Sequence, residues 1–126
     1  MEMRAEHARA FLNAADLIVG LGSDAGIEHT SNLIGSLAVL AGIAAADAIC
    51  GHALGERAAG ENHSDAVALL RRGSAVGDRS AAQLKRLLDV KTTTQYSRIL
   101  IGDGKAAQLL EIARSLVDGM ENRLRV

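Results

Sequence analysis

Asp47 is a single carboxylate in a long apolar stretch of this chain, where it stands between Ala46 and Ala48. An ionised carboxylate in such surroundings is costly unless a partner compensates its charge. Two interpretations stay open, a buried hydrogen bond that fixes one helix against another and a polar pocket that could perform acid–base chemistry or bind a ligand. The candidate partners of the carboxylate are His63, Lys91, Tyr96 and Arg98. The pocket interpretation predicts a ligand site made of Asp47, His63, Lys91 and Tyr96.

Arg57 and His63 form a second candidate site, within the polar segment ERAAGENH. Arginine binds phosphate oxygens in bidentate fashion, and histidine titrates near neutral pH. Such a pair suits acid–base chemistry directed at a phosphate group. The alternative is that Arg57 is solvated in a loop and that His63 stands near a helix start, bonded to a carboxylate. The sequence leaves both readings open.

Metal and cofactor chemistry has weaker support. His52 and Glu56 stand four residues apart, a spacing that can bind a metal on one face of a helix, but no second ligand pair at helical spacing accompanies them. The sequence contains no GxGxxG, GxxxxGK[ST], CxxC, HExxH or GxSxG motif. We therefore expect no metal and no cofactor. Cys50, beside Ile49, is expected to be a buried small hydrophobic residue.

The elements that must position these residues are helices. Apolar residues recur at three- and four-residue steps, and glycine or polar clusters interrupt the pattern. Thr30 or Ser31 is a candidate cap of the longest helix, Ser80 and Gln83 have capping-box spacing, and Asp103 can cap the last helix. The predicted helices are a first one over residues 2–20, the long one over 30–55, and a short one that begins between Asn62 and Ser64 and ends at Arg71 and Arg72. A fourth helix is predicted to begin at Ser80, a short one to follow over about 92–100, and the last one to run from Asp103 to about Arg123.

The predicted helix over 30–55 is unusually rich in small side chains and apolar on nearly all sides. At 1.5 Å rise per residue it is about 39 Å long, enough to run the full length of a small bundle. A helix of this kind must be covered on several sides. The sequence therefore predicts an all-α, up-and-down bundle of four to five main helices around this central helix, folded as one domain over 1–126, with successive helices antiparallel.

Composition limits the classes of function. The chain has 126 residues, no proline, two aromatic residues and a net charge of −1, so it has no long-range attraction for nucleic acid or anionic membranes. The apolar run 33–46 has about 14 residues, fewer than the roughly 20 that span a bilayer, and the N-terminus does not resemble a signal peptide. A lone cysteine gives no disulfide framework. We expect a cytoplasmic protein without membrane contact.

Three segments carry a resemblance to a known family: AADAICGHALGERAAGENH, SDAVALLRR and LLDVKTTTQYSRI. Over about residues 31–117 the chain resembles the HEPN-type helical bundles of bacteria, which are related to the substrate-binding bundles partnered with nucleotidyltransferases. The resemblance implies a bundle of four or five helices, usually a homodimer. Many members carry an Arg-x(4–6)-His motif and act as metal-independent ribonucleases, with Arg and His from both subunits at the scissile phosphate while the ribose 2′-hydroxyl attacks.

The position that matches this motif is Arg57 with His63. The chain departs from the pattern at Ala58, where a polar residue is usual, and at Gly60, which suggests a loop where active members have a helix. The sequence therefore predicts a non-catalytic HEPN-like binding or assembly module, with a nucleotide, RNA or protein as partner. The alternative is a metal-independent ribonuclease that uses Arg57 and His63. A homodimer is expected, with the central or the last helix in the contact.

Overall fold

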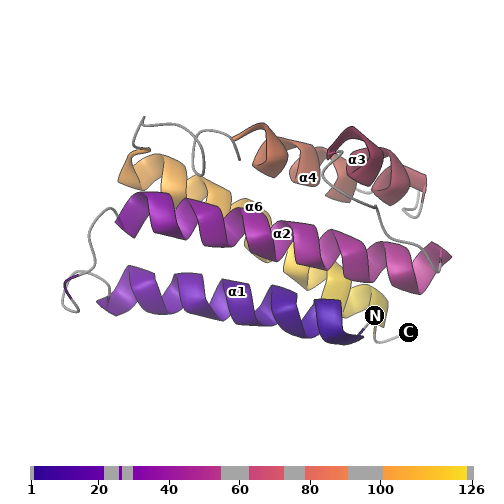
Figure 1. Cartoon of the computed structure of the whole chain (residues 1–126), viewed down its shortest axis with the longest axis horizontal. Helices are drawn as coiled ribbons and strands as arrows, with labels where there is room; N and C mark the ends of the chain where they lie inside the picture. The colour runs from indigo at the N-terminus through magenta and orange to yellow at the C-terminus, as the bar shows by residue number, and fades with distance from the viewer. Residues whose placement is uncertain are drawn as a thin grey trace.

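The computed structural model describes residues 2–21, 26, 30–54, 63–72, 79–90 and 101–124, and this part of the chain forms an all-α bundle (Figure 1). The predicted fold class is therefore confirmed. The predicted helix over 92–100 lies outside the described residues. The described helices are α1 (Glu2–Leu21), α2 (Thr30–Leu54), α3 (His63–Arg72), α4 (Ser80–Asp89) and α6 (Asp103–Leu124).

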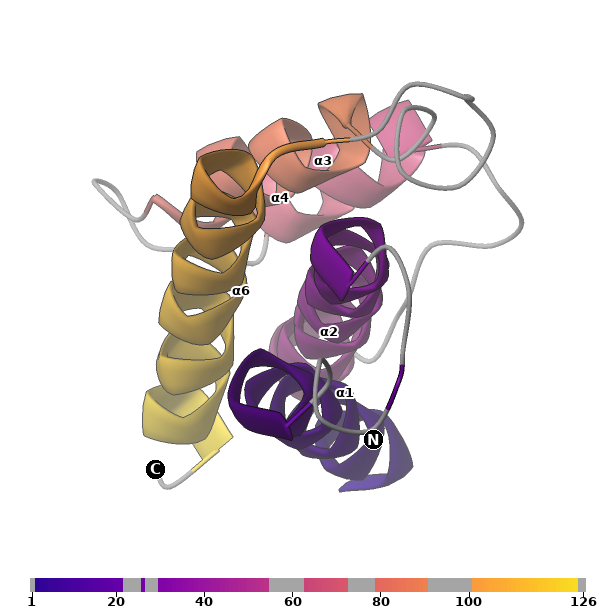
Figure 2. The ribbon, with the colours of Figure 1, turned by 90° about the vertical axis from the view of Figure 1, so that its left-hand side faces the viewer.

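Helix α2 occupies the centre of the bundle, as its sequence predicts. It contacts α1, α6, α3 and α4. Viewed from one end, α1 lies on one side of α2, the α3–α4 pair lies on the other, and α6 runs alongside (Figure 2). The buried residues of α2 are mostly small: Ala38, Ala41, Gly42, Ala44, Ala45, Ala46 and Ala48. Small side chains allow the neighbouring helices to approach the α2 backbone closely.

The three long helices have a defined relative direction. The Ser31 hydroxyl donates a hydrogen bond to Asp103, and the Ile101 backbone N–H donates to Asn32 Oδ1 at 2.9 Å, so α2 and α6 begin at the same end of the bundle. Arg9 near the start of α1 pairs with Glu121 near the end of α6. Helix α1 is therefore antiparallel to α6 and, because α2 and α6 start together, also to α2.

The inward faces agree with the predicted apolar stripes, with two exceptions. The residues at three- and four-residue steps along α6, Ala106, Leu109, Leu110, Ala113, Leu116, Val117 and Met120, are all buried, and so are Leu84, Leu87 and Leu88 of α4. Val19 continues the apolar steps of α1 but is 60% exposed, because it stands at the end of α1 beside an open cleft. Leu33, in the first turn of α2, is also exposed.

Three predicted caps are wrong, for one shared reason. The residue before α4 is Arg79, without a side-chain capping bond, while Ser80 accepts a hydrogen bond from Arg123 and the Gln83 amide donates to Ser115 Oγ. Ser31 lies inside the first turn of α2 and bonds to α6. Asp103 is the first residue of α6, and its carboxylate accepts from Ser31. These side chains join different helices instead of capping their own.

One helix of the described part of the chain is long and apolar enough to span a membrane, over the 23 residues Thr30–His52. The apolar run 33–46 ends before Asp47, whereas the helix continues past that carboxylate. In its most apolar window, 67% is buried within the protein. A core helix of a bundle passes the same test of length and composition.

Gly42 marks the closest approach of α2 to its neighbours. A Cβ added there would lie 2.3 Å from Leu87 Cδ1 and 3.4 Å from Leu116 Cδ1, and both leucines are fully buried. Overpacking of this kind costs about 1–3 kcal/mol, against about 1 kcal/mol gained in helix propensity. We predict that Gly42→Ala lowers the free energy of unfolding by about 1 kcal/mol in chemical denaturation.

Gly20 provides the matched control, because no atom lies within 4 Å of a Cβ added at this position of α1. Gly20→Ala should raise stability by about 0.5–1 kcal/mol. The strain should also depend on Leu87, so that Leu87→Ala costs less in the Gly42→Ala background than alone. Equal effects of the two glycine substitutions would contradict the close approach at Gly42.

Candidate functional site

Asp47 is held by Arg4, which extends from the first turns of α1. Arg4 Nε lies 3.1 Å and its terminal nitrogen 3.0 Å from Asp47 Oδ2. The pair is largely withdrawn from solvent, with 22% of the Arg4 and 16% of the Asp47 side chain exposed. Arg4 also contacts His7 Nδ1 at 3.1 Å. The carboxylate therefore ties α1 to α2, which agrees with the interpretation that it fixes one helix against another.

Arg4 was not among the partners named from the sequence. Of those, Lys91, Tyr96 and Arg98 lie outside the described residues, as does Arg57. His63 is the first residue of α3. The structure thus places Asp47 and Arg4 together, and the candidate site that combined Asp47 with His63, Lys91 and Tyr96 stays a prediction. Within the described ranges, no three His, Cys, Asp or Glu side chains are grouped as metal ligands would be.

Further ion pairs join α1 to α6. Arg114 makes two hydrogen bonds to Asp16, of 2.6 and 3.2 Å, and Arg9 lies 2.6 Å from Glu121. The hydrogen bonds that Arg114 donates to Asp16 raise the pKa of Arg114, and the nearby Glu111 and Asp118 carboxylates raise it further, against the effect of burial. These contacts hold α1 and α6 together along their length. They also pair much of the charge on the facing sides of the two helices.

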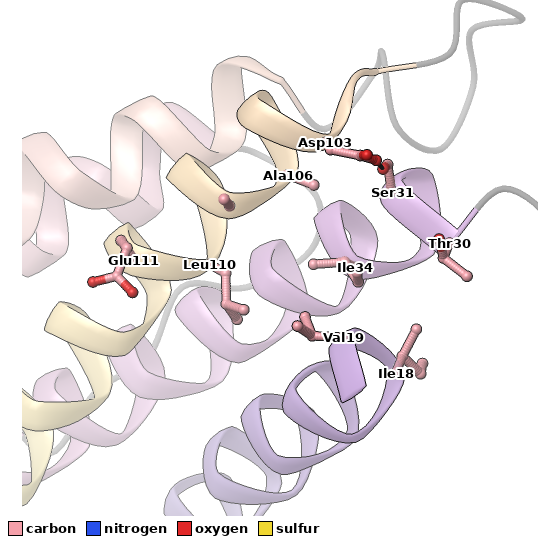
Figure 3. A pocket seen from close by; sticks show the side chains of 10 residues that line it. Ile18, Val19, Thr30, Ser31, Ile34, Asp103, Ala106, Leu110 and Glu111 are labelled. Atoms are coloured by element: carbon pink, nitrogen blue, oxygen red, sulfur yellow. Dashed lines mark hydrogen bonds between the residues drawn. The ribbon is translucent and has the colours of Figure 1, made fainter. Parts of the chain in front are cut away.

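A cleft of about 360 Å³ opens where the end of α1 meets the beginnings of α2 and α6 (Figure 3). Its walls are apolar, formed by Ile18, Ile34 and Leu110, and its rim is polar. At the rim, the Ser31 hydroxyl and the Asp103 carboxylate point toward one another and are joined by a hydrogen bond. This carboxylate gives the rim an acidic character, which does not suit an anionic ligand.

A second hollow lies between α4 and the last turns of α6, with a volume of about 440 Å³, and we call it the α4–α6 groove. Its described lining is polar and includes two arginines and no carboxylate. The lining residues are Arg79, Ser80, Gln83, Ser115, Gly119, Asn122 and Arg123.

No protein-family model matches this chain, and neither a curated protein nor a solved structure is significantly similar to it. The evidence for its function is therefore the geometry of its described residues.

Sequence reasoning missed Arg4, Arg79 and Arg123. Arg4 and Asp47 are 43 residues apart, and Ser80 and Arg123 are equally far apart. No short motif can connect such positions. The available signal for Arg4 was chemical: a carboxylate within an apolar helix needs a cation, and arginine is suited to a partly buried pair.

The Arg4–Asp47 pair should matter for stability. Removing one partner leaves a charge with little access to water, so we predict that Asp47→Leu lowers the free energy of unfolding by about 2 kcal/mol. Replacing both residues, Arg4→Met with Asp47→Leu, should cost less than the sum of the single changes. Urea denaturation of the four proteins of this cycle measures the coupling. Additive effects would show that the ion pair does not join α1 to α2 in solution.

Proposed function

We propose that this chain is a non-catalytic, HEPN-like binding and assembly module that works as a homodimer and forms its contact through the outward face of α1. The observation that carries this proposal is a second stripe on α1, opposite the stripe that packs on α2, whose members are apolar except for His7. The state of Asp47 supports a non-catalytic role, because its carboxylate is engaged by Arg4.

The outward stripe follows a regular heptad spacing. Its members are four, three, four, three and four residues apart, a pattern typical of the seam between two coiled helices. All are exposed except the half-buried Ala14, and Leu17 is 61% exposed. The stripe consists of Met3, His7, Ala10, Ala14, Leu17 and Leu21. We call it the α1 seam.

The α1 seam is complementary to a second copy of itself. In an antiparallel pair Met3 lies opposite Leu21, His7 opposite Leu17, and Ala10 opposite Ala14. Exchanging the two copies reproduces the same contacts, as a twofold interface requires. The alanines in the middle permit close approach of the two helices, and the large side chains at each end then cover one another. Burying a side chain the size of leucine or methionine completely is worth about 1.5–3 kcal/mol.

The sequence analysis expected the central or the last helix in the dimer contact. Helix α2 is covered by α1, α3, α4 and α6 within one protomer, and α6 faces both α1 and α4. Neither helix has an exposed large hydrophobic residue among those described, apart from Leu33 of α2. These facts favour α1 as the contact.

We predict that the protein is dimeric and that Leu17→Glu makes it monomeric, because forming the contact would then remove two charged carboxylates from water in place of two apolar side chains. Light scattering coupled to size exclusion, at several concentrations, measures the mass. Val19→Glu is the matched control, since Val19 is 60% exposed, stands two residues away and lies off the seam. A wild-type monomer at high concentration, or equal loss of the dimer in both variants, would contradict the α1 contact.

The ribonuclease alternative makes a different prediction. If Arg57 and His63 are catalytic, the purified protein cleaves RNA without added metal and His63→Ala abolishes the cleavage. Our proposal expects no cleavage by either protein above the level of a blank preparation. Cleavage by the wild-type protein that is lost in His63→Ala would show that the chain is an enzyme and not a non-catalytic module, whatever its oligomeric state.

A further inference from the structure

We propose that the α4–α6 groove binds the phosphate group of a small phosphorylated ligand, with Arg79 and Arg123 as the anion-binding residues. This inference gives a ligand class to the binding module proposed above. It does not require the α1 dimer. Arginine is suited to such a role because its planar guanidinium offers several N–H donors that match phosphate oxygens in bidentate fashion.

The charges of α6 are sorted between its two sides. On the side toward α1, Glu121 pairs with Arg9, and the Asp118 and Glu111 carboxylates act on Arg114. On the side toward α4, the groove is lined by Ser115, Gly119, Asn122 and Arg123. Among the described residues that line it, the groove thus has two cations and no anion.

The polar side chains of the groove are already oriented by one another. The Gln83 amide donates to Ser115 Oγ at 2.7 Å, and a terminal nitrogen of Arg123 lies 3.4 Å from Ser80 Oγ. Arg79 is exposed and forms no ion pair with any described residue. The groove therefore presents two guanidinium groups, that of Arg79 and that of Arg123, which is held by Ser80. Two such groups suit an anion with several oxygen atoms.

The first turn of α4 adds a weaker contribution from the same side. The Gln83 N–H makes the first intrahelical bond, to the Arg79 carbonyl, and Arg79 supplies no side-chain cap. N–H groups before that bond have no acceptor within the helix, and the helix dipole favours negative charge there. This feature supports the arginine pair and would carry no proposal alone.

The lining also limits which chemical group can be attached to the bound phosphate. The described lining residues offer hydroxyl, amide and guanidinium groups but no aromatic side chain on which a base could stack. This composition favours a sugar phosphate, whose hydroxyl groups can bond to Asn122 and Gln83, over recognition of a nucleobase. Gly119 forms part of the floor, where an added Cβ would lie 3.6 Å from an Arg123 nitrogen.

The test is a titration followed by NMR, which detects weak binding at the Nε–H signals of individual arginines. The probes are inorganic phosphate, ribose 5-phosphate and adenosine, each added to the full-length protein at constant ionic strength. We expect saturable shifts of the Arg79 and Arg123 signals with both phosphates, tighter binding of ribose 5-phosphate and no shift with adenosine. If inorganic phosphate gives saturable shifts and ribose 5-phosphate does not, the ligand of the groove is the free phosphate ion.

Variants separate the groove from general charge effects. Arg79→Met should weaken binding about tenfold, as expected for the loss of one charge-assisted contact. Lys105→Met removes the same charge from the opposite end of α6, where Lys105 is exposed, and should leave binding unchanged. Gly119→Leu should fill the groove and abolish binding while favouring the helix.

The inference is overturned if the shifts do not saturate, if adenosine produces them, or if Lys105→Met and Arg79→Met weaken binding equally. Leu17→Glu distinguishes this inference from the dimer proposal. A monomeric Leu17→Glu protein that still binds ribose 5-phosphate would leave both intact. Failure of the dimer in the light-scattering experiment would leave the result at the groove unaffected.

Discussion

The need to cover α2 on all sides is the constraint on which this structure depends. An apolar helix that carries mostly alanines offers little area at each contact, so its neighbours gain burial only by coming very close. Gly42 is the clearest sign of this requirement, since the buried side chains of Leu87 and Leu116 occupy the space beside its Cα. Helix α1, which precedes α2 in the sequence, and the helices that follow α2 therefore all pack against it.

Close packing of alanines leaves the register between helices poorly defined, because small side chains interlock weakly. Ion pairs and hydrogen bonds between helices provide that definition. Arg4 joins α1 to Asp47 of α2, Asp16 joins α1 to Arg114 of α6, and Ser31 and Asn32 fix the start of α2 against α6. The inward face of α1 and these charges serve the fold, so the proposed dimer contact and the proposed ligand site fall on other surfaces, the α1 seam and the α4–α6 groove.

The sequence predicted the helices and their inward faces closely, because periodicity and glycine breaks are local signals. It also predicted that Asp47 needs a partner, but not that Arg4 would supply it, since the rotation of α1 about its axis decides which of its cations reaches α2. Ser80 and Gln83 were misjudged because capping rules describe a helix alone, whereas α6 offers these side chains other partners. The groove could not be predicted, because it exists only where α4 and α6 meet.

Hydrogen exchange of the native protein, resolved by residue, tests most directly whether α2 is the covered centre of the bundle. The account predicts that amides over 38–49 exchange most slowly, at rates close to those set by global unfolding, and that the outward side of α1 exchanges faster. Exchange of the α2 amides as fast as those of α1 and α6 would contradict it, because a helix at the centre cannot open while its neighbours stay closed.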